Sequence, residues 1–166
     1  MIQNIGIVGS GQMGTGIAHV AALADRNIVL LDVNEAALNK ALEAIERNIQ
    51  RQVSRGKLED GAAERALKRI TTTTDYSDFN DADLVIEAAT ENEDVKRKIF
   101  ETLVPNLSKE ALIASNTSSI SITRLAATTD RPGKFIGMHF FNPVPIMQLV
   151  ELIRGIATED ATFTEI

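Results

Sequence analysis

The chain of 166 residues contains no cysteine and no tryptophan, and it has only two histidines. Without cysteine it can form neither a disulfide framework nor a thiolate metal site. The two histidines, His19 and His139, lie far apart in the sequence and offer no local pair of metal ligands. The composition therefore predicts a protein without a bound metal ion and without disulfide bonds.

The sequence also lacks an excess of basic residues and any long apolar run. It has 17 Lys and Arg residues against 23 Asp and Glu residues, which gives a formal net charge of −6 at pH 7. A protein that binds a phosphate backbone presents a basic surface, so nucleic acid is not an expected partner. No run approaches the ~18 apolar residues of a membrane span, and the N-terminus lacks the features of a signal peptide. We therefore expect a cytoplasmic protein with no membrane partner.

The sequence does contain enough apolar side chains for one buried core, because 44% of its residues are hydrophobic. Short apolar runs alternate with stretches of helical periodicity, which is typical of the α/β class with a doubly wound, mostly parallel sheet. We find no internal repeat or linker, so one domain is expected over residues 1–166. The expected strands cover residues 2–8, 27–31, 70–74, 84–88, 111–114 and 134–138. Residues 148–153 fit a last strand and the start of a helix equally well.

Helices are expected between these strands. The first covers residues 12–24, and Asn34 is placed to cap a second helix about 30 Å long. The apolar residues of this second helix recur at spacings of three and four: Leu38, Leu42, Ile45, Ile49 and Val53. A shorter helix follows to about Lys68, and residues 119–128 are also helix-like. A further helix is expected where apolar residues repeat every four positions, at Val95, Ile99, Leu103 and Leu107.

A glycine-rich segment joins the first strand to the first helix, and it reads Gly9, Ser10, Gly11, Gln12, Met13 and Gly14. In a βαβ unit this pattern binds a dinucleotide: the first glycine makes the tight turn, the second admits the pyrophosphate and the third packs helix on strand. The pyrophosphate is then bound by free N–H groups at the helix N-terminus. A glycine-rich turn without a ligand is the alternative.

Asp32 ends the second strand, roughly 20 residues beyond the glycine segment, where an acid binds the adenosine ribose hydroxyls. A carboxylate at this position repels a 2′-phosphate, so the pattern favours NAD over NADP as the cofactor. The alternative is that Asp32 only begins a turn with Asn34.

Polar side chains also follow the later strands, at Glu91, Asn116, Ser118 and His139. Ligands of open α/β sheets bind beyond the carboxyl ends of the strands, so these residues are expected around one crevice. These residues could also have purely structural roles. The serine-rich segment 115–121 could be a polar loop with a helix cap, and Glu91 could be an acid in the first turn of a helix. Lys96 could lie on a solvated helix face, and we expect His19 to be a packed or surface histidine.

His139 is a candidate general base. Oxidation of an alcohol by hydride transfer needs a group that takes the hydroxyl proton, and imidazole suits this role near neutral pH. Pro143 and Pro145 stiffen the backbone after it. If the chain reverses there, the Glu151 carboxylate can approach the ring, fix its tautomer and stabilise the imidazolium. A core histidine and an unrelated surface glutamate form the alternative.

Four segments together resemble the NAD-binding domain of the L-3-hydroxyacyl-CoA dehydrogenase family, and in particular its bacterial 3-hydroxybutyryl-CoA dehydrogenases. They read IGIVGSGQMGTGIA, LVIEAATEN, ASNTSSISIT and HFFNPVPIMQLVELI, in this order and spacing. The resemblance covers essentially the whole chain. It implies a Rossmann fold with a helical hairpin insertion and NAD-dependent interconversion of (S)-3-hydroxyacyl-CoA and 3-oxoacyl-CoA, in fatty-acid β-oxidation or butanoate metabolism.

The resemblance also implies roles for single residues. His139 matches the catalytic base and Glu151 its acidic partner, Ser118 matches the serine near the substrate oxygen and the nicotinamide, and Asn142 matches the asparagine of the HFFNP motif. The implied NAD contacts are the glycine segment, Asp32, Glu91, Lys96, Asn116, Ser118 and Asn142. The helical hairpin of the family helps to hold coenzyme A, which makes Arg51, Arg55 and Lys57 candidates for its phosphates, although a solvated basic face is as good an interpretation.

The family continues beyond this point with a helical C-terminal domain that covers the acyl group and forms a homodimer, so the chain is expected to be part of a longer enzyme. We expect these 166 residues to bind NAD with little turnover by themselves. Two other functions stay open: an NAD-binding module without catalysis, and a β-hydroxyacid dehydrogenase that acts on free acids and relies on a lysine base.

Overall fold

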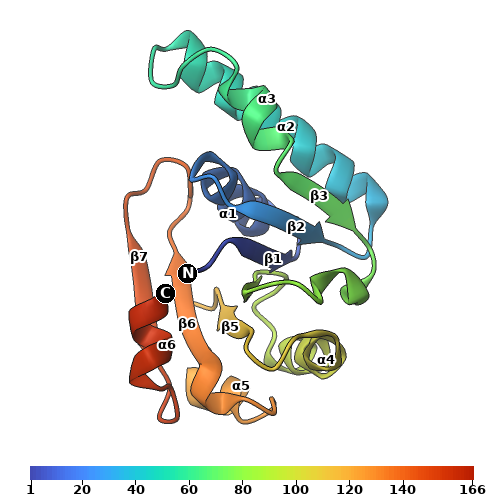
Figure 1. Ribbon diagram of the computed structural model, residues 1–166, viewed down its shortest axis with the longest axis vertical. Coiled ribbons are helices and arrows are strands. Elements are labelled where there is room, and N and C mark those ends of the chain that lie inside the picture. The colour runs from blue at the N-terminus through green and yellow to red at the C-terminus, as the bar shows by residue number, and fades with distance from the viewer.

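The computed structural model describes residues 1–166 as a seven-stranded sheet with helices on both faces (Figure 1). The strands are β1 (Asn4–Val8), β2 (Asn27–Leu31), β3 (Ile70–Thr73), β4 (Leu84–Glu87), β5 (Leu112–Ser115), β6 (Phe135–Phe140) and β7 (Val150–Arg154). The helices are α1 (Gln12–Leu23), α2 (Glu35–Ser54), α3 (Ala62–Leu67), α4 (Glu93–Leu103), α5 (Ile122–Ala126) and α6 (Asp160–Glu165). Three short 3₁₀ turns cover Tyr76–Phe79, Val104–Asn106 and Pro132–Lys134.

The strand order is β3-β2-β1-β4-β5-β6-β7. The first six strands are parallel, and β7 pairs antiparallel with β6. The chain starts in the middle of the sheet, fills one side and returns to fill the other, so the predicted doubly wound architecture is confirmed. The order reverses between β1 and β4, which is where such sheets open a crevice for a ligand.

Two apolar clusters, one on each face of the sheet, replace the single core expected from the composition. One contains Ile17 from α1 and Ile45 from α2, and the other contains Phe100 from α4 and Leu125 from α5. The expectation of one core was wrong because a parallel sheet with helices on both faces has to bury apolar side chains on both.

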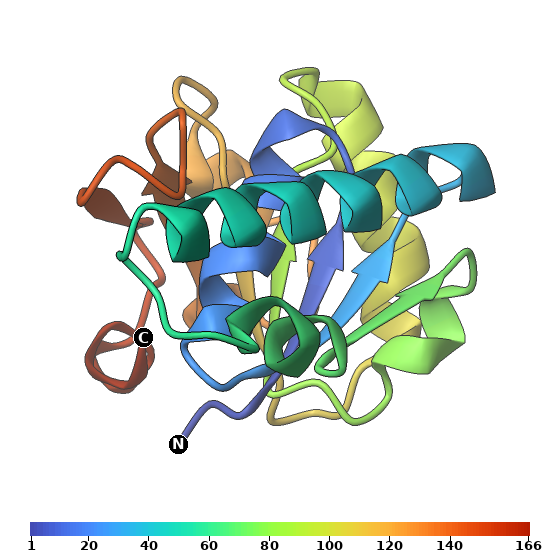
Figure 2. The same ribbon diagram turned by 90° about the horizontal axis from the view of Figure 1, so that it is seen from above.

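Asn34 caps α2 as expected, since its side-chain oxygen accepts hydrogen bonds from the N–H groups of Ala36 and Ala37. The 20 residues of α2 give the predicted length of about 30 Å. Together α2 and α3 form a hairpin at one end of the molecule, and α2 runs across α1 (Figures 1 and 2). No helix is long and apolar enough to cross a membrane.

The later elements differ from the sequence prediction in two places. Of residues 148–153, those from 150 onward form the strand β7, because they continue the sheet beside β6, while Gln148 and Leu149 precede the strand. The predicted apolar stripe of α4 is wrong at its first position, because Val95 is 43% exposed whereas Leu103 is buried as expected. Lys96 and Phe100 are buried as well. A lysine on the inner face of this helix has to be explained by a partner inside the protein.

Candidate active site

The glycine segment turns sharply between β1 and α1, and two of its glycines are required by the geometry. Gly9 has φ of +101°, a left-handed conformation that side chains rarely adopt. A Cβ atom on Gly14 would lie 1.8 Å from the Gly9 carbonyl oxygen, so any side chain there would separate α1 from β1. The predicted roles of the first and third glycines therefore follow from the backbone.

The N-terminus of α1 is open to a ligand. A Cβ atom on Gly11 would meet no atom within 4 Å. Gly11 caps the helix without a side-chain hydrogen bond, and no acidic residue occupies the first turn. Free N–H groups beside empty space suit an anionic group such as the pyrophosphate of a dinucleotide.

Asp32 follows β2 and faces the glycine segment. One carboxylate oxygen accepts hydrogen bonds from the Ser10 N–H group at 2.8 Å and the Ser10 hydroxyl at 2.7 Å, and the other accepts from the Asn34 N–H group at 3.1 Å. Burial alone would raise the pKa of Asp32, but these hydrogen bonds outweigh it and lower the pKa. The group is thus a carboxylate at neutral pH, held beside the glycine segment.

His139 and Glu151 meet across the two strands β6 and β7. The antiparallel register pairs the two residues directly, which places their side chains on the same face of the sheet. The distance between His139 Nδ1 and Glu151 Oε2 is 2.9 Å. A pocket of about 370 Å³ lies beside this pair and is also lined by Ser118. The chain reversal that the sequence analysis required is the turn between β6 and β7.

Glu91 joins the segment after β4 to the segment after β5. Its Oε1 atom accepts hydrogen bonds from the Thr117 hydroxyl at 2.6 Å, from the N–H groups of Ser118 and Ser119 at 2.9 and 3.2 Å, and from both serine hydroxyls at 3.2 Å. Partial burial raises the pKa of Glu91, but the hydrogen bonds outweigh it and lower the pKa. The Ser118 hydroxyl is therefore held at the crevice by a carboxylate.

Lys96 is not at the surface of the crevice. Its side chain is 1% exposed, and its Nζ atom lies 2.5 Å from Glu87 Oε2 and 3.3 Å from Ser115 Oγ. The Ser115 hydroxyl also donates to Glu87 at 2.8 Å. These three side chains form a closed buried network under the ends of β4 and β5, so a direct contact of Lys96 with NAD does not follow from the geometry.

The two asparagines of the prediction lie on different sides of the crevice. Asn116 follows β5, and its Oδ1 atom accepts a hydrogen bond from the Phe140 N–H group at 2.8 Å. Asn142 lines a pocket of about 390 Å³ together with Gly11 and Gln12. It thus lies across from the N-terminus of α1.

The basic residues of the hairpin line a separate pocket of about 480 Å³. Arg51, Arg55 and Lys57 lie there opposite Pro143 and Gln148, which belong to the segment between β6 and β7. The three cationic side chains are thereby brought to one place. None of them has a salt bridge to an acidic residue of the chain.

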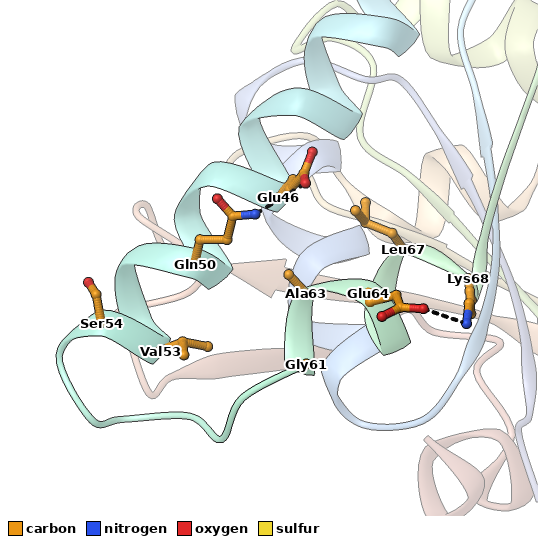
Figure 3. Close-up of a pocket in the computed structure, with 9 residues that line it drawn as sticks. All are labelled: Glu46, Gln50, Val53, Ser54, Gly61, Ala63, Glu64, Leu67 and Lys68. Atoms are coloured by element: carbon orange, nitrogen blue, oxygen red, sulfur yellow. Dashed lines mark hydrogen bonds and ion pairs between the residues drawn. The ribbon is translucent and has the colours of Figure 1, made fainter.

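A larger pocket of about 640 Å³ lies between α2 and α3 (Figure 3). Its polar side chains pair with each other, Gln50 with Glu46 and Lys68 with Glu64. None of the predicted site residues lines it. Size alone therefore does not identify the site, and the convergence of polar groups at the strand ends does.

Sequence reasoning missed Glu87 and Ser115 as supports of the site. A signal was present, because a glutamate within the apolar strand LVIEA needs a buried partner. The identity of that partner, nine residues later on α4, could not be read from the sequence, since Lys96 was expected on a solvated or cofactor-facing surface. His19 is buried in α1, and this agrees with the expected packed histidine.

The chain matches a sequence profile described as "3-hydroxyacyl-CoA dehydrogenase, NAD binding domain" over residues 4–166. It is 57% identical over 163 residues to the 3-hydroxybutyryl-CoA dehydrogenase of Bradyrhizobium diazoefficiens, which covers 98% of this chain and 56% of that protein. It is 44% identical to the 3-hydroxyadipyl-CoA dehydrogenase of Escherichia coli, over 95% of this chain and 33% of that protein.

Solved structures agree with these sequence matches. The crystal structure of (S)-3-hydroxybutyryl-CoA dehydrogenase from Ralstonia eutropha superposes with a TM-score of 0.97 at 48% identity, over 99% of this chain and 58% of that one. A lactate dehydrogenase from Cryptosporidium parvum, at 18% identity and a TM-score of 0.61, shares only the fold. The chain spans just over half the length of the 3-hydroxybutyryl-CoA dehydrogenases that it matches.

Proposed function

This chain belongs to the family of 3-hydroxyacyl-CoA dehydrogenase NAD-binding domains, and on that premise we propose that it serves the NAD-dependent oxidation of (S)-3-hydroxyacyl-CoA to 3-oxoacyl-CoA. The family is the one that the sequence motifs predict, and NAD is its cofactor. The names of the most similar relatives favour a short acyl chain, with 3-hydroxybutyryl-CoA as the substrate.

The residues at the crevice fit NAD. The open N-terminus of α1 suits the pyrophosphate, and the Asp32 carboxylate suits the adenosine ribose. NAD, when bound, accepts the hydride from the substrate carbon. Glu91 and Ser118 follow β4 and β5, on the other side of β1 from Asp32, and together with Asn142 they are proposed to border the nicotinamide half.

The observation that carries the proposed mechanism is the His139–Glu151 pair at 2.9 Å. Glu151 accepts a hydrogen bond from the Nδ1–H group of the ring, so the proton stays on Nδ1 and Nε2 has a free lone pair. This lone pair takes the hydroxyl proton of the substrate. The carboxylate then stabilises the imidazolium that results. The Ser118 hydroxyl, which donates to Glu91 in the structure, would turn its proton to the substrate oxygen when substrate binds and so orient it.

The substrate is proposed to lie along the segment between β6 and β7. Arg51, Arg55 and Lys57 line the pocket on the hairpin side of this segment and would bind the phosphates of coenzyme A. A β-hydroxyacid dehydrogenase acting on free acids is disfavoured, because the pocket beside Ser118 is lined by a histidine with an acidic partner and not by a lysine. Homodimer formation and a cytoplasmic location remain predictions.

Replacement of the proposed base tests the mechanism. We expect His139→Gln, in a chain extended by the C-terminal part of the Bradyrhizobium relative, to fold and bind NADH normally but to lose turnover. A general base contributes ~10²–10⁴-fold, and the loss should appear in kcat rather than in KM. The measurement is oxidation of NADH with acetoacetyl-CoA, followed by absorbance. A folded variant with unchanged kcat would dismiss His139 as the base.

We further propose that the 166 residues by themselves bind NAD but turn substrate over slowly. Glu151 has a side chain that is 53% exposed, so water reaches the proposed proton path. Orientation of the reactants supplies ~7–11 kcal/mol of a barrier, and an open site orients a flexible acyl chain poorly. Titration with NADH followed by addition of acetoacetyl-CoA separates this proposal from a module without any catalysis. A kcat/KM equal to that of the Ralstonia enzyme would contradict it.

A further inference from the structure

We propose that Asn116 is a positioning residue, which orients His139 by holding the backbone of the next residue, Phe140. The inference rests on the proposed function, in which His139 is the base. It gives the Asn116 carboxamide oxygen a role within the protein, where the sequence motif implied a contact with NAD.

The register of the sheet shows why a side chain is needed at this point. Backbone pairing between β5 and β6 ends at Ser115 and Gly137. On the other side of β6, pairing with β7 continues to Phe140 and includes the pair of His139 with Glu151. The end of β6 that carries the base is therefore paired with a strand on one side only.

The Asn116 side chain supplies a contact on the other side. Its Oδ1 atom accepts the hydrogen bond of the Phe140 N–H group at 2.8 Å. Phe140 is 8% exposed, so its N–H group would otherwise be unpaired in a largely dry environment. The carboxamide thus continues the hydrogen bonding between β5 and β6 beyond the last backbone pair.

Asn116 is itself held from two directions. Its own N–H group donates to the Glu87 carbonyl oxygen at 2.8 Å, and the preceding residue, Ser115, belongs to the buried network with Lys96. The three residues that follow Asn116 are held by the Glu91 carboxylate. An anchored side chain can fix the strand end to which it bonds.

The distance between His139 Nδ1 and Glu151 Oε2 depends on this strand end. At 2.9 Å the contact is an optimal hydrogen bond, and a displacement of less than ~1 Å would break it. Loss of the bond would release the ring from the tautomer that leaves Nε2 free. Asn116 therefore acts on the reaction through the direction and tautomer of the base.

Nitrogen NMR of the histidine rings tests the inference directly, because the chain has only two histidines to assign. The measurement reports which ring nitrogen of His139 carries the proton. We compare the unmodified chain with Asn116→Ala and Asn116→Leu, which remove the acceptor, and with Asn116→Asp, which retains it. Glu151→Gln shows the spectrum of a ring that has lost its partner.

We expect the unmodified chain and Asn116→Asp to hold His139 with the proton on Nδ1, and the Ala and Leu variants to shift toward the spectrum of Glu151→Gln. An unchanged His139 spectrum in a folded Ala or Leu variant would overturn the positioning role alone. A His139 ring without the Nδ1 proton in the unmodified chain would instead overturn the His139–Glu151 pair of the proposed function.

Hydrogen exchange of the Phe140 amide decides the matter if neither acceptor-free variant folds. Protection of this amide in the unmodified chain and in Asn116→Asp supports the inference, because in both chains a side-chain oxygen at position 116 can accept the hydrogen bond of the amide. Rapid exchange of the Phe140 amide in the unmodified chain would refute it.

Discussion

Asp32 combines a proposed role in cofactor binding with hydrogen bonds that hold the local structure. Its carboxylate accepts hydrogen bonds from Ser10 and Asn34 and is half-buried beside the glycine segment. We expect Asp32→Ala to weaken NAD binding roughly ten- to hundred-fold, since a hydrogen bond to a charged group contributes ~1.5–3 kcal/mol. The preference for NAD over NADP should narrow, because the charge that repels a 2′-phosphate is lost. Fluorescence titrations with NADH and NADPH measure both effects.

Asn34→Ala is the matched control for this prediction. It removes the cap of α2 and should lower the free energy of unfolding by about 1 kcal/mol without changing the ratio of the two affinities. If Asp32→Ala behaved like Asn34→Ala, Asp32 would be a turn residue and not a ribose ligand.

Glu91 gives the site a predictable dependence on pH. Hydrogen bonds from residues 117–119 lower its pKa in the folded protein, whereas an unfolded glutamate titrates near ~4.3. A lowered carboxyl pKa stabilises the fold above the unfolded pKa, and this stabilisation is lost as the pH falls through the folded pKa. The difference in unfolding free energy between the unmodified chain and Glu91→Gln should therefore be largest at neutral pH and shrink below about pH 4.3.

Urea unfolding at a series of pH values measures this difference. Glu43→Gln is the control, because Glu43 is exposed on α2 and accepts no side-chain hydrogen bond. A Glu91→Gln chain with the same dependence on pH as the Glu43→Gln chain would show that the hydrogen bonds at Glu91 contribute nothing to stability.

At the scale of elements, Lys96 fixes α4 against β4 and β5. Its ammonium group is inside the protein and is matched by the Glu87 carboxylate and the Ser115 hydroxyl. We expect Lys96→Met to destabilise the fold by ~3–5 kcal/mol, because the Glu87 carboxylate would remain buried without an opposite charge. Denaturant unfolding measures the loss.

The double variant Lys96→Met with Glu87→Gln should recover part of that stability, since the uncompensated charge is gone. Lys98→Met, at an exposed position of the same helix, should change stability little. Equal losses in the single and double variants would mean that packing, and not charge, explains the effect.

The same helix shows what sequence periodicity could and could not predict. The spacing of apolar residues located α4 and most other elements, and the capping residue Asn34 located the start of α2. The inner face of α4 was misjudged because Lys96 was expected either at a solvated helix face or against the cofactor, and in neither case inside the protein. Periodicity treats charge as a mark of exposure, and it therefore fails where two distant charged residues are buried together.

The candidate site, like the helices and strands, could be predicted only in part from the sequence. Strand ends brought His139 and Asp32 to one edge of the sheet, because parallel strands all point the same way. The expected reversal of the chain brought Glu151 beside His139. The contact between Asn116 and Phe140 was out of reach, since it depends on where backbone pairing between β5 and β6 ends. Register is a property of two distant segments, and a single sequence with no pairing information does not contain it.

At the scale of the whole molecule, β7 forms one edge of the sheet (Figure 1). Large apolar side chains are exposed along β7 and the segments on either side of it: Ile146, Met147, Leu149, Val150, Ile153, Ile156 and Phe163. Edge strands offer unpaired backbone groups, and contiguous apolar surface of this kind marks an interaction site. The chain therefore has both the hydrogen-bonding groups and the apolar area for association at this edge.

We predict that the 166-residue chain self-associates through this edge in a concentration-dependent way. Sedimentation velocity at increasing protein concentration measures the association. Ile146 and Ile156 are 71% and 89% exposed, so Ile146→Lys with Ile156→Lys should reduce association without disturbing the core. Val33→Lys is the control, because Val33 is 87% exposed but lies between β2 and α2 on the other side of the sheet, and it should leave association unchanged. A charge at an unpaired edge opposes the approach of a second apolar surface. Equal association of the unmodified chain, the double variant and the control would therefore place the contact elsewhere. A monomer at every concentration would show that the exposed edge needs no partner.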